Sequence, residues 1–249
     1  LGFEDGLPEL ERTYLEIEFA HCADRQDLQT HIADADIYLG ALNRQEFLAA
    51  RALKWIQSPS TGVDRFLAIP ELAQGDVLLT SATGTHGPPL AEHTMALILA
   101  LTRHIPECVL RQRDHRWALQ ALRTRMVELT GSTLGIVGFG VSGRAIAKRA
   151  QAFDLRIVAV DLFPKDRPNY VAWLAGPDGL ERLLGESDYV VVTVPHTPRN
   201  RGMLGAEQLA LMRPGARLIV ISRGGIVDET ALGRALREGP LAGAALDVA

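Results

Sequence analysis

The chain has 249 residues, of which 47% are hydrophobic and 22% are charged, and its formal net charge at pH 7 is −4. This length and composition allow one large or two modest globular domains with a sizeable core. The slightly acidic balance gives no reason to expect nucleic acid or an anionic membrane as a partner.

Targeting and redox signals are sparse. We find no signal peptide, and the most apolar run, residues 95–101 (MALILAL), is far too short to span a bilayer. Cys22 and Cys108 are far apart, and neither stands at a metal-site spacing from the other or from a histidine. Two such cysteines are expected to be buried thiols in a reducing compartment. We therefore expect a cytoplasmic protein with no membrane partner and no metal.

The first part of the chain alternates between strand and helix patterns. Helices are expected over 23–35, 44–52 and 70–74, and strands over 14–20, 36–42, 53–60 and 76–82. Alternation of this kind predicts βαβ units around a parallel sheet. We assign residues 1–84 to a first domain.

A cluster of small residues, glycines and prolines at 81–89 is typical of a hinge or linker. Two helices are expected after it, over 90–104 and 106–122. The first contains the run MALILAL, which predicts a helix buried on all sides at a domain or subunit interface.

The remaining sequence forms a second alternating series. Helices are expected over 143–153, 179–184, 206–211 and 229–238, and apolar, mostly β-branched strands over 133–139, 155–161, 189–195, 217–223 and 242–248. Strands of this composition are typical of a doubly wound parallel sheet covered on both faces. The fold class is therefore α/β, with a second domain over 85–249.

Three glycines stand where the strand 133–139 passes into the next helix. Gly138, Gly140 and Gly143 have the spacing that allows a tight turn, approach of a pyrophosphate to the backbone, and close packing of helix on strand. Asp161 ends the next strand, at the distance expected for an acid that binds the adenosine ribose. The motif predicts NAD rather than NADP, because Asp161 repels a 2′-phosphate. The alternative is simple packing of a helix on a strand.

Lys165 and Arg167 follow Asp161 closely and could weaken the preference for NAD. The alternative interpretation of both is solvated loop charge.

Five segments in order resemble the D-isomer-specific 2-hydroxyacid dehydrogenases. They are SPSTGVDRF (58–66), LAEHTMALILALTRHIP (90–106), LTGSTLGIVGFGVSGRAIA (129–147), VPHTPRNRGML (194–204) and ISRGGIVDETALGRALREGPLAGAALDV (221–248). The resemblance implies a flavodoxin-like substrate domain, a Rossmann NAD-binding domain and a homodimer. It also implies hydride transfer between a nicotinamide and C2 of a small 2-oxo acid or D-2-hydroxy acid.

The resemblance also implies roles for individual residues. Arg223 matches the catalytic arginine, whose guanidinium grips a substrate carboxylate and polarises the carbonyl; a structural pair with Asp228 is the alternative. Thr61 and Gly62 match the loop whose amides receive that carboxylate, although an ordinary turn would use the same residue types. On the cofactor, the resemblance implies contacts from Val141, Ser142, Val194, Ile221, Ser222 and Asp247.

The chain departs from the family pattern at its ends. The family's acid, a His paired with a Glu, is expected beyond Ala249, and an opening strand is expected before Leu1. We therefore interpret the sequence as lacking both ends of the family's chain. His196 is expected to line the pocket near the cofactor, with a direct catalytic role as the alternative. His93 is expected to be a hydrogen-bonded core or interface histidine. A protein that binds NAD and dimerises without chemistry remains the alternative function.

Overall fold

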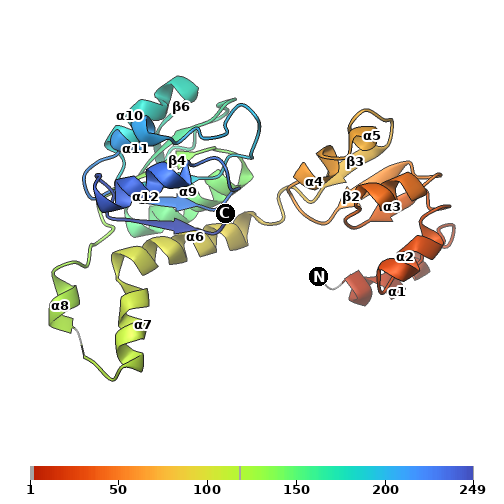
Figure 1. Cartoon of the computed structure of the whole chain (residues 1–249), viewed down its shortest axis with the longest axis horizontal. Helices are drawn as coiled ribbons and strands as arrows, with labels where there is room; N and C mark the ends of the chain where they lie inside the picture. The colour runs from red at the N-terminus through yellow and green to blue at the C-terminus, as the bar shows by residue number, and fades with distance from the viewer. Residues whose placement is uncertain (1–2, 118, 249) are drawn as a thin grey trace. The chain divides into compact units, whose positions relative to one another are not determined.

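The computed structural model describes residues 3–117 and 119–248. Two compact units make up the chain, Leu1–Thr83 and Gly84–Ala249. Both are built from parallel strands joined by helices (Figure 1).

The first unit contains a three-stranded parallel sheet of order β1-β2-β3. The strands are β1 (Ile37–Leu39), β2 (Trp55–Ser58) and β3 (Leu78–Ser81). The helices are α1 (Phe3–Thr13), α2 (Arg25–His31), α3 (Arg44–Ala49), α4 (Asp64–Leu67) and α5 (Pro70–Ala73). Its core is apolar, formed by Leu28, Ile32, Leu42, Leu53, Ile56, Phe66, Ile69 and Leu72.

The strand predicted over 14–20 is wrong. Helix α1 ends at Thr13, and the residues after it form turns and irregular backbone. Leu15 is 86% exposed, so the alternating apolar residues of this segment have no sheet to cover. Periodicity indicates a strand only where a neighbouring strand accepts its hydrogen bonds, and β1, β2 and β3 pair only with one another among the described residues.

The second unit contains a six-stranded parallel sheet of order β6-β5-β4-β7-β8-β9. The strands are β4 (Thr133–Val137), β5 (Arg156–Val160), β6 (Val171–Ala175), β7 (Tyr189–Val192), β8 (Arg217–Val220) and β9 (Gly243–Leu246). The strand order reverses between β4 and β7, which is the point where doubly wound sheets bind their ligands. The predicted doubly wound sheet is confirmed.

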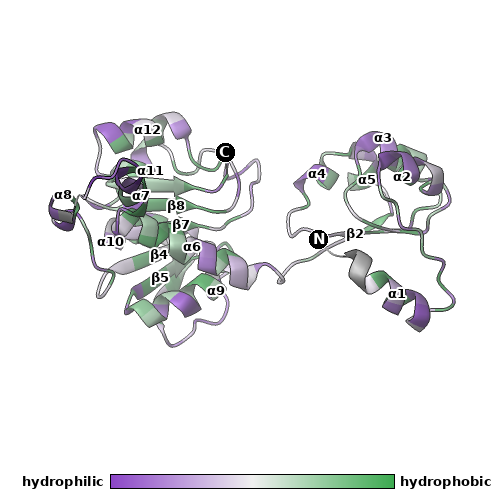
Figure 2. Ribbon diagram, turned by 90° about the horizontal axis from the view of Figure 1, so that it is seen from below, coloured by the Kyte–Doolittle hydropathy of each residue, from purple (hydrophilic) through white to green (hydrophobic). Residues whose placement is uncertain are grey.

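Helices cover both faces of this sheet. One face packs on α6 (Gly87–Thr102) and α9 (Val141–Ala150), which is followed by a 3-10 turn, Gln151–Phe153. The other packs on α10 (Leu180–Glu186), α11 (Ala206–Ala210) and α12 (Glu229–Arg237). Figure 2 shows apolar strands between helices whose outer faces are hydrophilic. Burial on both faces explains why β4, β7 and β8 are continuous apolar runs.

Two predictions differ from the structure around this sheet. Strand β6 was not predicted, because its run VAWLA is short and lies at the sheet edge after Pro168. The single helix predicted over 106–122 is wrong: α7 (Ile105–Arg113) and α8 (Leu119–Arg123) are separate. His115 interrupts the helix with a positive φ of 54°. Ala118, which falls in the predicted helix, lies outside the described residues.

Within the single chain, one side of helix α6 is buried, and the predicted burial of its other side at a domain or subunit interface stays a prediction. Ala91, Thr94, Met95 and Ile98 are buried, whereas Leu97, Leu99 and Leu101 are only partly covered. Helices α7 and α8 continue from it and project from the unit (Figure 1).

Candidate functional site

The predicted site residues of the second unit follow the carboxyl ends of its strands. They are Gly138 and Gly140 after β4, Asp161 after β5, Val194 after β7, Ile221, Ser222 and Arg223 after β8, and Asp247 after β9. In a parallel sheet these ends share one edge, so the fold gathers the whole set along that edge.

Packing within the protein requires two of the three glycines, Gly138 in the turn after β4 and Gly143 in the first turn of α9. Gly138 has φ +98°, and a Cβ there would lie 2.7 Å from the Thr193 Oγ1 atom. Thr193 Oγ1 in turn donates a 2.6 Å hydrogen bond to the Gly138 carbonyl, which joins the ends of β4 and β7. A Cβ on Gly143 would lie 2.2 Å from the Gly138 oxygen, so only glycine lets α9 pack this closely.

Gly140 has no such internal reason. Its φ of −75° suits any residue, and a Cβ there would meet no atom within 4 Å. The space above it is open at the start of α9, where the amides of Val141, Ser142 and Gly143 have no acceptor within the helix. Open space beside free amides fits the phosphates of a dinucleotide.

The Asp161 carboxylate is bound to the backbone on both sides. It accepts a 2.6 Å hydrogen bond from the Phe139 amide on Oδ2 and a 2.9 Å bond from the Phe163 amide on Oδ1. The acid therefore ties the glycine turn to the end of β5. Each carboxylate oxygen can accept a second hydrogen bond, which leaves capacity for ribose hydroxyls.

Arg167 is engaged elsewhere in the loop after Asp161. Its guanidinium donates to the carbonyl oxygens of Val171 and Ala172 at the start of β6. This interaction corrects the interpretation of Arg167 as merely solvated charge.

The loops after β7 and β8 lie against each other. A Cβ on Gly225 would lie 3.4 Å from His196 Nε2, so the imidazole lies close to the turn that follows Arg223. The Gly202 amide also donates a 2.8 Å hydrogen bond to the Gly225 carbonyl. His196 is partly buried beside this turn.

Arg223 is exposed after β8, and its Nη1 donates a 2.7 Å hydrogen bond to the Ser222 carbonyl. Asp228, the alternative partner for Arg223, accepts a 2.9 Å hydrogen bond from the Ala231 amide and caps α12. The Ser222 side chain is buried, and its Oγ has no hydrogen-bond partner among the described residues. A buried hydroxyl without a partner is a polar group that a bound ligand can satisfy.

Asp247 contacts a residue that the sequence does not connect with it. His93 Nε2, on α6, lies 3.1 Å from Asp247 Oδ1, and the two side chains are 45% and 41% exposed. His93 is therefore hydrogen-bonded but is not a core histidine.

Thr61 and Gly62 belong to the first unit, in the loop between β2 and α4. Hydroxyl groups order this loop: Ser60 Oγ donates to the Gly62 carbonyl at 2.8 Å, and buried Ser58 contacts Ser60. The loop follows the carboxyl end of its strand, as the loops of the second unit do.

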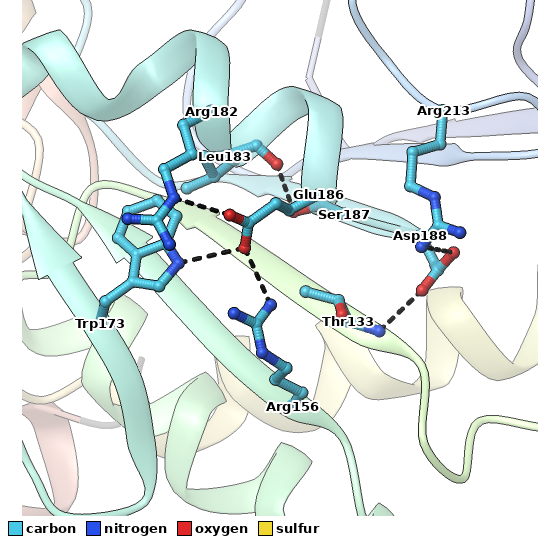
Figure 3. A network of polar contacts seen from close by, with 9 residues as sticks. All are labelled: Thr133, Arg156, Trp173, Arg182, Leu183, Glu186, Ser187, Asp188 and Arg213. Atoms are coloured by element: carbon cyan, nitrogen blue, oxygen red, sulfur yellow. Dashed lines mark hydrogen bonds and ion pairs between the residues drawn. The ribbon is translucent and has the colours of Figure 1, made fainter.

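A charged network occupies the opposite edge of the six-stranded sheet, at the amino ends of its strands (Figure 3). Glu186 accepts hydrogen bonds from Arg182 at 2.6 Å, Arg156 at 2.9 Å and Trp173 at 3.2 Å. Beside it, Asp188 binds the Thr133 amide and Arg213. These hydrogen bonds lower the pKa of Glu186 from 4.5 to about 2, and the bond from Arg182 has the largest effect. Because it joins strand starts rather than ligand loops, this network has a structural role.

Cys22 and Cys108 are free and partly buried, rather than the fully buried thiols expected. Within the described residues, no group of three or more His, Cys, Asp or Glu side chains is placed to hold a metal ion. No described helix has the length and apolarity needed to cross a membrane.

The strand order, the glycine turn and the acid after β5 define a dinucleotide-binding protein of the Rossmann type. Residues 95–249 match the family description "D-isomer specific 2-hydroxyacid dehydrogenase, NAD binding domain". The chain therefore belongs to the D-isomer specific 2-hydroxyacid dehydrogenases, and the predicted family is confirmed.

Individual relatives agree. The chain is 37% identical to D-3-phosphoglycerate dehydrogenase of Bacillus subtilis, in an alignment that covers 98% of this chain and 46% of that protein. It is 33% identical to glyoxylate reductase of Pyrococcus furiosus, covering 90% of this chain and 69% of that protein. The crystal structure of D-lactate dehydrogenase from Aquifex aeolicus, complexed with NAD and lactic acid, matches with a TM-score of 0.80 and 25% identity over 99% of this chain and 74% of that one. The chain spans less than half the length of the phosphoglycerate dehydrogenases that it matches.

Proposed function

We propose that the protein transfers hydride between NAD and C2 of a small 2-oxo acid or D-2-hydroxy acid. The observation that carries this proposal is the open space at Gly140, beside Asp161 and on the same sheet edge as Arg223. A dinucleotide site by itself would support only the binding of NAD. A guanidinium exposed on that same edge supports chemistry on an anionic substrate.

The proposed cofactor contacts follow from the positions of the strand ends. The amides of Val141, Ser142 and Gly143 would hold the pyrophosphate, and Asp161 the adenosine ribose. Toward the nicotinamide we propose Val194, Ile221, Ser222 and Asp247, which follow β7, β8 and β9. The bound nicotinamide would supply or accept the hydride.

Arg223 is proposed as the catalytic residue. Its guanidinium can hold the substrate carboxylate and polarise the adjacent carbonyl, because a planar fork donates two parallel hydrogen bonds. Reduction would move a hydride from NADH to C2 and a proton from solvent to the carbonyl oxygen, which gives the 2-hydroxy acid and NAD⁺. The amides of Thr61 and Gly62 are proposed to bind the substrate carboxylate as well, in a loop that the hydroxyls of Ser58 and Ser60 keep ordered.

The test is the consumption of NADH with a series of 2-oxo acids, among them glyoxylate, hydroxypyruvate, pyruvate and phosphohydroxypyruvate. We expect turnover with at least one of them and with NADH in preference to NADPH. Arg223→Lys should lower kcat/KM by at least about a hundredfold while leaving the NADH dissociation constant within about twofold. Tight NADH binding without turnover on any 2-oxo acid would contradict the enzymatic proposal and leave only a binding function.

We also propose a homodimer in which α7 and α8 contact the second copy. Ile105, Val109 and Leu110 on α7 are about half exposed, and Trp117 is 91% exposed. A hollow of about 540 Å³ lies between these helices, lined by Cys108, Arg111, Gln112, His115, Arg116, Trp117, Leu122 and Met126. An exposed apolar surface of this kind typically marks a protein interface.

We propose a cytoplasmic location, which two free cysteines favour.

A further inference from the structure

The contact between His93 and Asp247 joins two segments that are 154 residues apart in the chain. An ionised carboxylate can only accept hydrogen bonds, so the imidazole Nε2 carries the hydrogen in this 3.1 Å contact. The bond uses Oδ1 of Asp247, and Oδ2 is not part of it.

This contact is poorly suited to stabilising the fold. Both side chains are nearly half exposed, and hydrogen-bonded pairs in that setting contribute little to stability. The core beneath them is formed by other α6 residues, such as Ala91, Met95 and Ile98.

The backbone at Asp247 is already fixed. Its amide donates a 2.9 Å hydrogen bond to the Val220 carbonyl, which continues the pairing of β9 with β8 beyond Leu246. Only the side-chain torsions of Asp247 remain free, and a half-exposed aspartate has several rotamers available. The imidazole of His93, supplied by a helix that packs on β8 and β9, selects one of them.

We propose that His93 is a positioning residue that holds the Asp247 carboxylate toward the nicotinamide end of the cofactor. This inference rests on the proposed function, because it takes Asp247 as a contact of the nicotinamide. His93 itself touches neither cofactor nor substrate. Because His93 already holds the Asp247 side chain in one rotamer, less side-chain entropy is lost when the cofactor binds. Removal of His93 should therefore weaken the binding only of ligands that carry a nicotinamide.

The experiment compares NAD⁺ with ADP-ribose, which has the same adenosine, ribose and pyrophosphate groups but no nicotinamide. Dissociation constants are measured by calorimetry for the wild-type protein, His93→Leu, His93→Gln and Asp247→Ala. We expect His93→Leu to weaken NAD⁺ binding about fivefold to tenfold and to leave ADP-ribose within twofold. His93→Gln, whose amide nitrogen can replace Nε2, should keep most of the NAD⁺ affinity.

The double variant His93→Leu/Asp247→Ala should bind NAD⁺ no more weakly than Asp247→Ala, because the histidine acts through the aspartate. Glu92→Gln is the matched control: it removes the 2.8 Å ion pair between Glu92 and Arg149 from the same helix but leaves His93 unchanged. It should bind both ligands as the wild type does.

The outcomes separate the two proposals. Equal weakening of NAD⁺ and ADP-ribose in His93→Leu, or no weakening of either, would overturn the positioning role while the dinucleotide site stands. Additive losses in the double variant would also overturn it. If the wild-type protein bound neither ligand, the proposed function itself would fail, and the role of His93 with it.

Discussion

The carboxylate of Asp161 accepts a 2.6 Å hydrogen bond from the amide of Phe139, which lies between the first two glycines of the turn. The acid at the end of β5 therefore does two things at once. It shapes the turn that would receive the pyrophosphate, and it offers further acceptor capacity to a ribose. Loss of the carboxylate should affect both the fold and the cofactor preference.

We expect Asp161→Ala to lower the free energy of unfolding by about 1–2 kcal/mol, because it leaves the partly buried Phe139 amide without its acceptor. Asp161→Asn keeps one carbonyl acceptor and removes the negative charge. It should lose less stability and should narrow the ratio between NADPH and NADH dissociation constants. Denaturant unfolding and fluorescence titration measure the two effects. An unchanged cofactor ratio in Asp161→Asn would show that this acid does not set the preference.

The three glycines should respond differently to alanine. In Gly143→Ala the new Cβ would lie 2.2 Å from the Gly138 oxygen, so we expect a loss of about 3 kcal/mol in the free energy of unfolding. In Gly140→Ala the Cβ enters open space at an unstrained φ, so stability should stay the same or rise by about 0.5 kcal/mol.

Binding should show the reverse pattern for Gly140. The Cβ of Gly140→Ala would occupy the space proposed for the pyrophosphate. This variant should therefore bind NADH at least about tenfold more weakly, although its stability stays normal. Thermal unfolding with and without NADH distinguishes the two effects. If Gly140→Ala bound NADH as the wild type does, the open space would not be the phosphate site.

The Glu186 network should contribute stability that depends on pH. Its hydrogen bonds to Arg182, Arg156 and Trp173 lower the pKa of Glu186 in the folded state to about 2, whereas the unfolded chain titrates near its ordinary value of 4.5. A depressed pKa stabilises the folded state above the unfolded pKa, and this contribution is lost as the pH falls from about 5 toward 2.

Glu186→Gln should therefore destabilise the protein at pH 7 by about 1 kcal/mol, a modest amount because the arginine partners are exposed. The difference from the wild type should shrink in urea unfolding measured at successively lower pH. NADH binding at pH 7 should not change, since the network lies at the edge of the sheet away from the site. A difference that stays constant between pH 7 and pH 3 would contradict this assignment.

The proposed dimer can be broken on α7. Val109→Glu together with Leu110→Glu places two charges on residues that are 57% and 53% exposed, so the separate chain should tolerate them. We expect sedimentation to show dimers for the wild type and monomers for this variant. Leu236→Glu, on an exposed part of α12, is the control and should remain dimeric. A monomeric wild type at micromolar concentration would contradict the proposal.

Much of the site could be predicted because its residue types are local signals. Gly138, Gly140 and Asp161 occupy strand ends that the apolar runs mark directly, and Arg223 ends another such run. Contacts between loops had no such signal. Nothing in the sequence indicates that Thr193 binds the Gly138 carbonyl or that Phe139 is the partner of Asp161.

The sequence by itself determined the doubly wound sheet, since β-branched runs buried on both faces and a glycine turn are properties of short segments. Only the tertiary structure decided which segments pair: it left 14–20 without a strand partner, added Val171–Ala175 as an edge strand, and brought His93 to Asp247. The physical reason is that periodicity and turn chemistry act over a few residues. Hydrogen bonds between strands, and side chains that meet across loops, depend on how the whole chain packs.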